Sequence, residues 1–284
     1  MRTKLLLSIL FFISISGKTK AIPAEGGDSL YFFNSNLLFI PTEASIFESK
    51  NGVTKYFDTK NLKLDIGATI DLIGLKHGEK EYSFGADFFT FSNLRSESNF
   101  KFPVDAIDYM FGINFNMRLK QNEKWKMSYR LRISHISSHF EDGHIYERTD
   151  TIFTPVVFSK EFFDLAAVSD YKLGEGFYLK NLLALNYVFH SIPEDASGFS
   201  GQIGIETKYF FTKIFSAYLS SDFVLAEVNS NTNLNLNIET GLSLGRVNSR
   251  ALMLYFSYYD GQDYRGQYYG KYLNNHGIGL RIKF

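Results

Sequence analysis

Apolar and polar residues alternate with a period of two along most of this chain. From Leu62 to Leu72 every second residue is apolar, and the residues between them are polar or glycine. The segment 108–119 and the last ten residues, Asn275–Phe284, follow the same pattern. Because successive side chains of a β-strand point to opposite faces, this alternation predicts strands with one apolar face and one polar face.

Eleven such strands are predicted, at 62–72, 82–91, 109–119, 125–139, 160–171, 177–190, 199–211, 214–226, 234–244, 250–259 and 276–284. Their connections alternate between short turns, such as 212–213 and 247–249, and long segments, such as 140–159 and 260–275. Short periplasmic turns and long extracellular loops are typical of bacterial outer-membrane barrels, which have an even number of strands. We therefore expect an all-β fold, a transmembrane antiparallel up-and-down β-barrel of about 12 strands.

The twelfth strand must lie in the weakly patterned segment 22–60, where 42–50 is a candidate for a short strand. A soluble β-sandwich also alternates, and barrels of ten or fourteen strands remain alternatives at this stage. The closing strand, which ends on Phe284, resembles the closing strand of Gram-negative outer-membrane β-barrels. That resemblance implies location in the bacterial outer membrane, contact with outer-membrane lipid, and the barrel assembly machinery as a partner that reads the terminal strand.

The first residues have the features of a signal peptide. Arg2 and Lys4 precede an apolar run at 5–15, and small residues lead to a predicted cleavage site after Ala21. The expected organisation is a signal peptide at 1–21 and a barrel domain at 22–284. A net charge of zero argues against nucleic acid as a partner, and the absence of cysteine excludes disulfide and thiolate chemistry.

The predicted inner face of the barrel carries charges of both signs. We expect these side chains to line the lumen: Arg130, Arg132, Asp65, Asp108, Arg118, Glu206, Glu239 and Arg281. An unpaired buried charge is costly, so mixed charges in a narrow lumen favour pairing across strands over a wide aqueous path. A narrow pore or a structural barrel with a charge-filled lumen is the favoured function, with no cofactor and no metal.

The strand at 125–139 departs from the pattern at its extracellular end. Its outward row is apolar up to Ile133 and then continues as His135, Ser137 and His139. Residues two apart on a strand lie on the same face, with their Cα atoms about 6.6 Å apart. An imidazole at one position can therefore reach a hydroxyl at the other. A base beside a hydroxyl is the arrangement of an activated serine nucleophile, although polar groups are also tolerated at the membrane interface.

The His135-x-Ser137 pair is similar to the local motif of outer-membrane phospholipase A and of the lipid A deacylases. That resemblance implies an alternative function, acyl hydrolysis of outer-leaflet lipids, with Ser137 as nucleophile and His135 as base. The residue that orients the base is open, and Glu141 is the candidate carboxylate that follows the strand. A metal site built from His135, His139 and His144 is disfavoured by their spacing.

Four histidines are expected at the surface rim of the extracellular side: His139, His144, His190 and His276. The tyrosine-rich segment 264–272 is a further candidate for surface binding, or for packing within the rim. The strand Arg130-x-Arg132-x-x-His135-x-Ser137-Ser138-His139 resembles that of an uncharacterised bacterial barrel family, as does the segment Phe39-Ile40-Pro41. The resemblance implies the barrel fold and no activity. The sequence does not give the oligomeric state.

Overall fold

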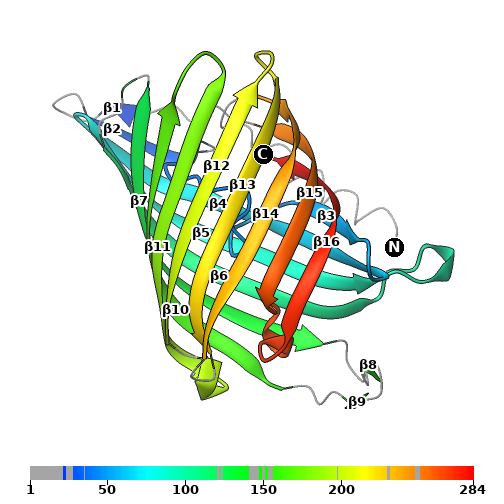
Figure 1. The fold of residues 1–284 in the computed structure, drawn as a ribbon. Coiled ribbons are helices and arrows are strands. Elements are labelled where there is room, and N and C mark those ends of the chain that lie inside the picture. Colours follow the sequence, from blue (N-terminus) through cyan, green and yellow to red (C-terminus); the bar gives the residue numbers. More distant parts are fainter. Residues whose placement is uncertain are drawn as a thin grey trace, which may run out of the picture.

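The computed structural model describes residues 22–23, 28–34, 36–119, 122, 124–140, 147–148, 151–152, 156–196, 198–228, 231–246 and 250–284. These residues form a closed antiparallel barrel in which consecutive long strands pair with each other (Figure 1). The predicted signal peptide at 1–21 lies outside the described residues. Eleven long strands build the wall: β4 (Asn61–His77), β5 (Lys80–Arg95), β6 (Val104–Arg118), β7 (Trp125–Phe140), β10 (Phe158–Lys172), β11 (Phe177–Ile192), β12 (Gly198–Phe210), β13 (Phe215–Val228), β14 (Asn231–Gly245), β15 (Ala251–Gln262) and β16 (Tyr272–Lys283).

The twelfth strand is β3 (Gly52–Tyr56), which pairs with β16 on one side and with β4 on the other and so closes the barrel. A second short strand, β2 (Ser29–Asn34), pairs with β4 near its other end and with β1 (Ile22–Pro23). The predicted barrel of about 12 strands is therefore confirmed. The prediction of a strand at 42–50 was wrong, because that segment lies in the lumen.

The remaining elements are short. They are the two-residue strands β8 (Glu147–Arg148) and β9 (Thr151–Ile152), and the 3-10 turns η1 (Ser98–Phe100), η2 (Glu194–Ala196) and η3 (Gly266–Tyr268). Among the described residues, no helix is long and apolar enough to cross a membrane.

The outer face of the barrel is apolar along most of its strands. Leu183 and Leu185 on β11 are 60% and 62% exposed, and large apolar residues on the other strands are exposed in the same way. A lipid bilayer offers no hydrogen bonds, so a closed barrel with an apolar exterior satisfies the backbone where an open sheet would not. The chain is thus a β-barrel of the bacterial outer membrane.

The C-terminus and the short turns lie together at the top of Figure 1, which corresponds to the periplasmic side. The connection between β15 and β16 lies at the bottom, the extracellular side. Register shifts occur in the β4–β5, β5–β6 and β10–β11 pairs, and the one in β4 changes which residue faces outward. A register shift between Asp71 and Ile73 makes Leu72 a bulge residue, and Ile73 then faces outward with 46% exposure. The predicted outward position of Leu72 is therefore taken by Ile73.

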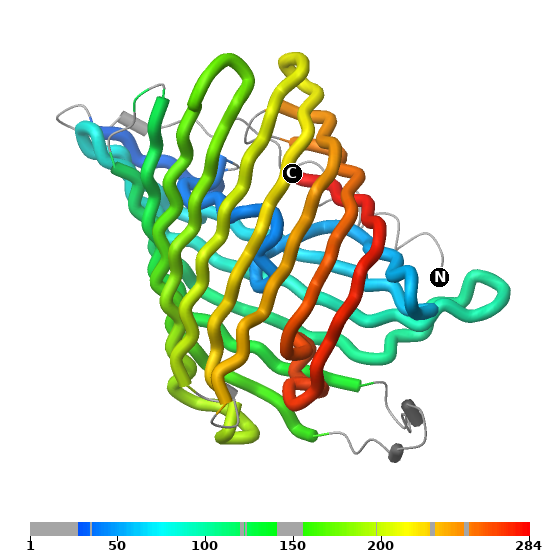
Figure 2. Tube along the Cα trace, viewed as in Figure 1, coloured from blue at the N-terminus to red at the C-terminus, as the bar shows by residue number. Residues whose placement is uncertain are grey.

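Residues 36–51, which we call the plug, run through the inside of the barrel between β2 and β3 (Figure 2). The plug touches the inner faces of strands on opposite sides of the wall. The Glu43 amide donates to Glu206 Oε2 of β12 at 2.7 Å, and Lys50 Nζ lies 3.2 Å from Glu239 Oε1 of β14. On the other side, Arg118 of β6 donates to the Leu37 carbonyl at 2.8 Å. These contacts hold the plug in the middle of the lumen.

An apolar cluster lies in the extracellular half of the lumen. It contains Phe89, Phe91, Met110, Ile136, Phe158, Phe162 and Val188, and Phe47 of the plug packs against it. Gly67 faces Phe89 across the β4–β5 pair, where an added Cβ would lie 2.1 Å from the Phe89 Cβ. Glycine at this position therefore leaves room for the phenylalanine ring in the narrow interior.

The connection at 263–271 closes the extracellular end by folding inward. The Gly266 amide donates to Asp108 Oδ1 at 2.9 Å, and Tyr264 packs edge-on against Phe91. Burial raises the pKa of the Tyr264 phenol above its usual range, which keeps the phenol neutral. Tyr268 is buried, whereas Tyr272 is exposed. Packing within the rim, one of the two predicted roles of this segment, accounts for most of its tyrosines.

Candidate functional site

The charges that the sequence places on the inner face lie there, and most of them contact the plug. Arg130 of β7 donates to both carboxylate oxygens of Glu48, at 2.9 and 2.6 Å, and to Asp164 Oδ1 of β10 at 2.8 Å. Arg132 lies beside the same two carboxylates. Its Nη1 is 3.4 Å from Glu48 Oε2, and its Nε is 3.5 Å from Asp164 Oδ1. Two guanidinium groups and two carboxylates thus form one neutral cluster between wall and plug.

A second cluster joins the plug to the closing strand. Arg281 of β16 makes two bonds of 2.9 Å with the carboxylate of Glu239 and lies 3.3 Å from Glu43. Lys283 donates to Glu43 at 2.5 Å, and Lys50 of the plug contacts Glu239. The terminal strand is therefore tied to the plug as well as to its neighbouring strands.

The other predicted lumen residues are also engaged. Asp65 lies 2.9 Å from Lys63, Asp108 accepts hydrogen bonds from Ser138 and from the Gly266 amide, and Glu206 accepts the Glu43 amide. Arg118 donates to carbonyls of the plug. The charged side chains of the lumen are thus paired with partners, as expected from the cost of an unpaired buried charge. The sequence did not reveal that a segment of the same chain supplies many of the partners.

On the outer wall, β7 presents His135, Ser137 and His139 outward, while Ser134, Ile136 and Ser138 are buried on the inner side. The outward direction of the row is the one predicted from its alternation. Rings from the neighbouring strand lie beside it. The ring of Tyr109 on β6 is edge-on to the His139 ring, with centroids 5.7 Å apart, and the centroids of the Phe111 and His135 rings are 6.5 Å apart.

A carboxylate on the next strand binds His135. Glu161 of β10 pairs with His135 across the β7–β10 ladder and with His190 across the β10–β11 ladder. Its Oε1 lies 2.6 Å from His135 Nδ1, and its Oε2 lies 2.5 Å from His190 Nδ1. Three adjacent strands therefore bring one carboxylate and two imidazoles together on the lipid-facing wall, near its extracellular end.

Glu161 is the site residue that sequence reasoning missed. The alternation of β10 places Glu161 on the outward row, where charged residues are rare. A charge on this row is the feature of the sequence that could have identified Glu161 as a site residue. The pairing register of β7 with β10 was needed to match it to His135. The predicted orienting residue, Glu141, and the rim residue His144 lie outside the described residues, so both stay predictions.

The remaining members of the predicted set are separate. No hydrogen bond joins His135 to Ser137 within the described part of the chain, although the two side chains share one face. His276 lies at the extracellular end of β16 and pairs with Asp58 at 2.9 Å, away from the Glu161 group. In the described ranges, no group of three or more His, Asp or Glu side chains is arranged to hold a metal ion.

Residues 61–284 match the model of a family described as protein of unknown function, DUF1207. The chain belongs to this family. No curated protein matches the sequence. The family match covers the whole wall from β4 to β16, and with it the strands that carry His135, Ser137 and Glu161.

Solved structures of outer-membrane proteins are similar to this chain at low sequence identity. Outer membrane phospholipase A from Escherichia coli has a TM-score of 0.48 and 14% identity, covering 87% of this chain and 95% of its own. OmpT of Vibrio cholerae has a TM-score of 0.43 and 9% identity, covering 93% and 100%. The beta domain of the Bordetella autotransporter BrkA has a TM-score of 0.40 and 11% identity, covering 82% and 98%.

Proposed function

We propose that this barrel hydrolyses acyl esters of outer-leaflet lipids. In this proposal Ser137 is the nucleophile, His135 is the general base, and Glu161 orients His135. The observation that carries the proposal is the 2.6 Å contact between Glu161 Oε1 and His135 Nδ1 on the lipid-facing wall. A hydroxyl, an imidazole and a carboxylate on one face are the three groups that serine hydrolysis uses.

The roles follow from which ring nitrogen faces the carboxylate. With Nδ1–H donating to Glu161, the lone pair of His135 lies on Nε2. Nε2 takes the hydroxyl proton of Ser137 while Ser137 Oγ attacks the carbonyl carbon of the ester. The bond from acyl carbon to alkoxy oxygen then breaks, and His135 returns the proton to the leaving alcohol. A water molecule attacks the acyl-enzyme in the same way and releases the fatty acid.

The surroundings of the three residues suit a lipid substrate. Phe111 on β6 and Phe163 on β10, the two strands that flank β7, are 48% and 41% exposed on the outer wall. Such rings lie where an acyl chain of the outer leaflet runs along the barrel. An ester group near the headgroups would then lie at the level of Ser137, because the row turns from apolar to polar at His135.

The two reacting side chains need one local adjustment. Ser137 and His135 are two residues apart on one face, at a Cα separation of about 6.6 Å, so a side-chain rotation brings Oγ to the imidazole. Catalytic hydrogen bonds are often long in a protein without substrate and shorten when substrate binds. His190 contacts the second oxygen of Glu161 and holds the carboxylate in place.

Fatty-acid release from phospholipid and from lipid A by the purified, folded barrel tests the proposal. We expect release by the native protein and its loss in a Ser137→Ala variant, by roughly a thousandfold or more. Ser221→Ala is the matched control, since Ser221 also lies on the outer row, on β13. Equal release by the native protein and the Ser137→Ala variant would overturn the assignment.

A second candidate function is a conduit that opens when the plug leaves the lumen. The observation in its favour is that one continuous segment, 36–51, supplies Glu43, Glu48 and Lys50 to the charged wall. In planar bilayers we expect the native protein to be silent and a variant with 36–50 replaced by a short Gly-Ser linker to conduct. A silent linker variant that is correctly folded would remove this candidate.

A further inference from the structure

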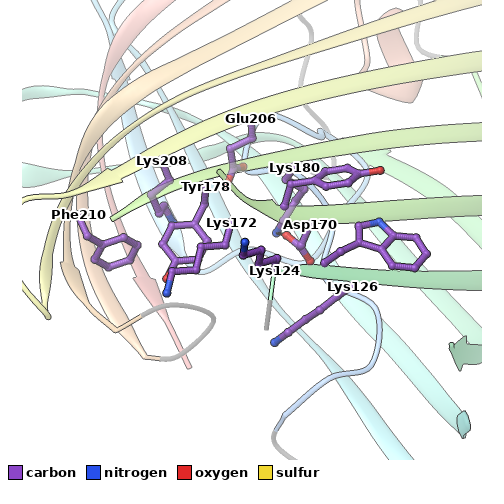
Figure 3. A pocket seen from close by; sticks show the side chains of 11 residues that line it. Lys124, Lys126, Asp170, Lys172, Tyr178, Lys180, Glu206, Lys208 and Phe210 are labelled. Atoms are coloured by element: carbon purple, nitrogen blue, oxygen red, sulfur yellow. Dashed lines mark ion pairs between the residues drawn. The ribbon is translucent and has the colours of Figure 1, made fainter. Parts of the chain in front are cut away.

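A lysine-rich cavity lies at the periplasmic end of the barrel (Figure 3). Four adjacent strands, β7, β10, β11 and β12, surround a cavity of about 60 Å³. Its lining includes five lysines: Lys124, Lys126, Lys172, Lys180 and Lys208.

The charges around this cavity are strongly unbalanced. Among the described residues, two carboxylates line it, Asp170 and Glu206. Asp170 lies 3.8 Å from Lys180, and Glu206 is already engaged by the Glu43 amide at 2.7 Å. Lys208 interacts electrostatically with Glu206 and Glu43. Within the described residues, no carboxylate lies at ion-pair distance from the remaining three lysines, Lys124, Lys126 and Lys172. The chain as a whole has no net charge, so this local excess is a property of the site.

The walls and the inner end of the cavity are well defined. Tyr178 and Phe210 form an edge-on aromatic pair with ring centroids 5.6 Å apart. Lys180 is buried and donates to the Pro41 carbonyl of the plug at 3.2 Å. The plug therefore closes the inner end, and the cavity is a pocket open to the periplasm.

We propose that this pocket binds a small periplasmic solute that carries two or more phosphoryl groups. Lysine ammonium groups bind phosphate as compact point charges, and charge-assisted hydrogen bonds of this kind are strong. Three cations without a carboxylate partner, next to one that is buried, match a ligand with several negative charges. The aromatic pair offers an apolar surface to the rest of such a molecule.

Calorimetric titration of the full-length, folded protein with inorganic pyrophosphate tests this pocket. The heat of binding should follow a saturable curve. A Lys126→Gln/Lys172→Gln double variant should bind roughly tenfold or more weakly, because each lost charge contact is worth about a factor of ten. A Lys126→Arg/Lys172→Arg variant should retain binding, since both positive charges remain.

A matched control removes two lysines from another part of the same rim. Lys76→Gln/Lys80→Gln changes the β4–β5 turn and should leave pyrophosphate affinity unchanged. Equal weakening in this control, or native affinity in the Lys126→Gln/Lys172→Gln variant, would overturn the proposal. A parallel titration uses phosphatidylglycerol vesicles. A response to vesicles with none to pyrophosphate would assign the lysines to membrane headgroups and would also overturn it.

Discussion

The charged groups inside the barrel and those on its outer wall are held in opposite surroundings. Inside, Arg130 lies between Glu48 and Asp164, and all three side chains are at least 90% buried. Outside, Glu161 lies between two histidines, and His135 and His190 are 40% and 60% exposed. The inner cluster neutralises itself and fixes the plug. A carboxylate on a lipid-facing wall is rare, which is why we propose the outer group rather than the inner cluster as the site of chemistry.

The largest expected effect is on the proposed hydrolysis at the outer group. Glu161→Gln keeps the shape of the side chain but removes the charge that stabilises a protonated His135. We expect kcat for fatty-acid release to fall by roughly 10²- to 10⁴-fold with little change in KM. Steady-state kinetics on a dispersed ester substrate measure both constants. A native kcat in this variant would mean that the Glu161 contact serves structure alone.

The next largest effect tests the inner cluster. Glu48→Ala leaves Arg130 and Arg132 with Asp164 as their remaining carboxylate, and breaking a buried ion pair costs about 3–5 kcal/mol. We expect a lower midpoint in urea unfolding of the detergent-solubilised barrel, with fatty-acid release retained at temperatures where the variant is folded. An unchanged midpoint would show that the plug adds little to stability.

A smaller effect is expected at the second histidine of the outer group. His190→Ala removes one of the two contacts that hold Glu161, so kcat should fall about tenfold or less, while Glu161 still orients His135. His276→Ala is the control at the same rim, because His276 pairs with Asp58 instead. A loss in the His276→Ala variant as large as that in His190→Ala would indicate a general effect of rim histidines.

The smallest effect is expected at an exposed ion pair. Glu97 contacts Arg95 at 3.2 Å near the extracellular loop after β5, and both side chains are substantially exposed. Surface pairs of this kind contribute about 0–1 kcal/mol. Glu97→Ala should therefore leave the urea midpoint close to that of the native protein. A shift as large as that of Glu48→Ala would remove the contrast between inner and outer charges.

The long strands could be predicted from the sequence because alternation is a local signal. The eleven predicted strands correspond to β4–β7 and β10–β16, and the closing strand indicated the membrane class. The short β3 could not be located, since its five residues carry too little pattern. Within the plug, 42–50 is only a candidate for a short strand in the sequence, because a segment held by long-range contacts inside the barrel has no periodic pattern of its own.

Part of the candidate site could likewise be predicted from the sequence, and part could not. The outward direction of His135 and Ser137 follows from parity along one strand, and it could be predicted. The Glu161 contact depends on the register between β7 and β10, which are separated by the long connection 141–157. Register across such a connection is set by the whole sheet and not by the local sequence. From the sequence alone, the candidate to orient His135 is therefore a carboxylate close to it along the chain, Glu141.

Covalent labelling of the serine tests the central claim most directly. A long-chain fluorophosphonate should react with the folded barrel by forming a bond from phosphorus to Ser137 Oγ with loss of fluoride. Peptide mass spectrometry should then find the adduct on Ser137, with labelling much slower in the Glu161→Gln variant. A folded barrel that is not labelled, or is labelled at another serine at the same rate in both proteins, would contradict the account.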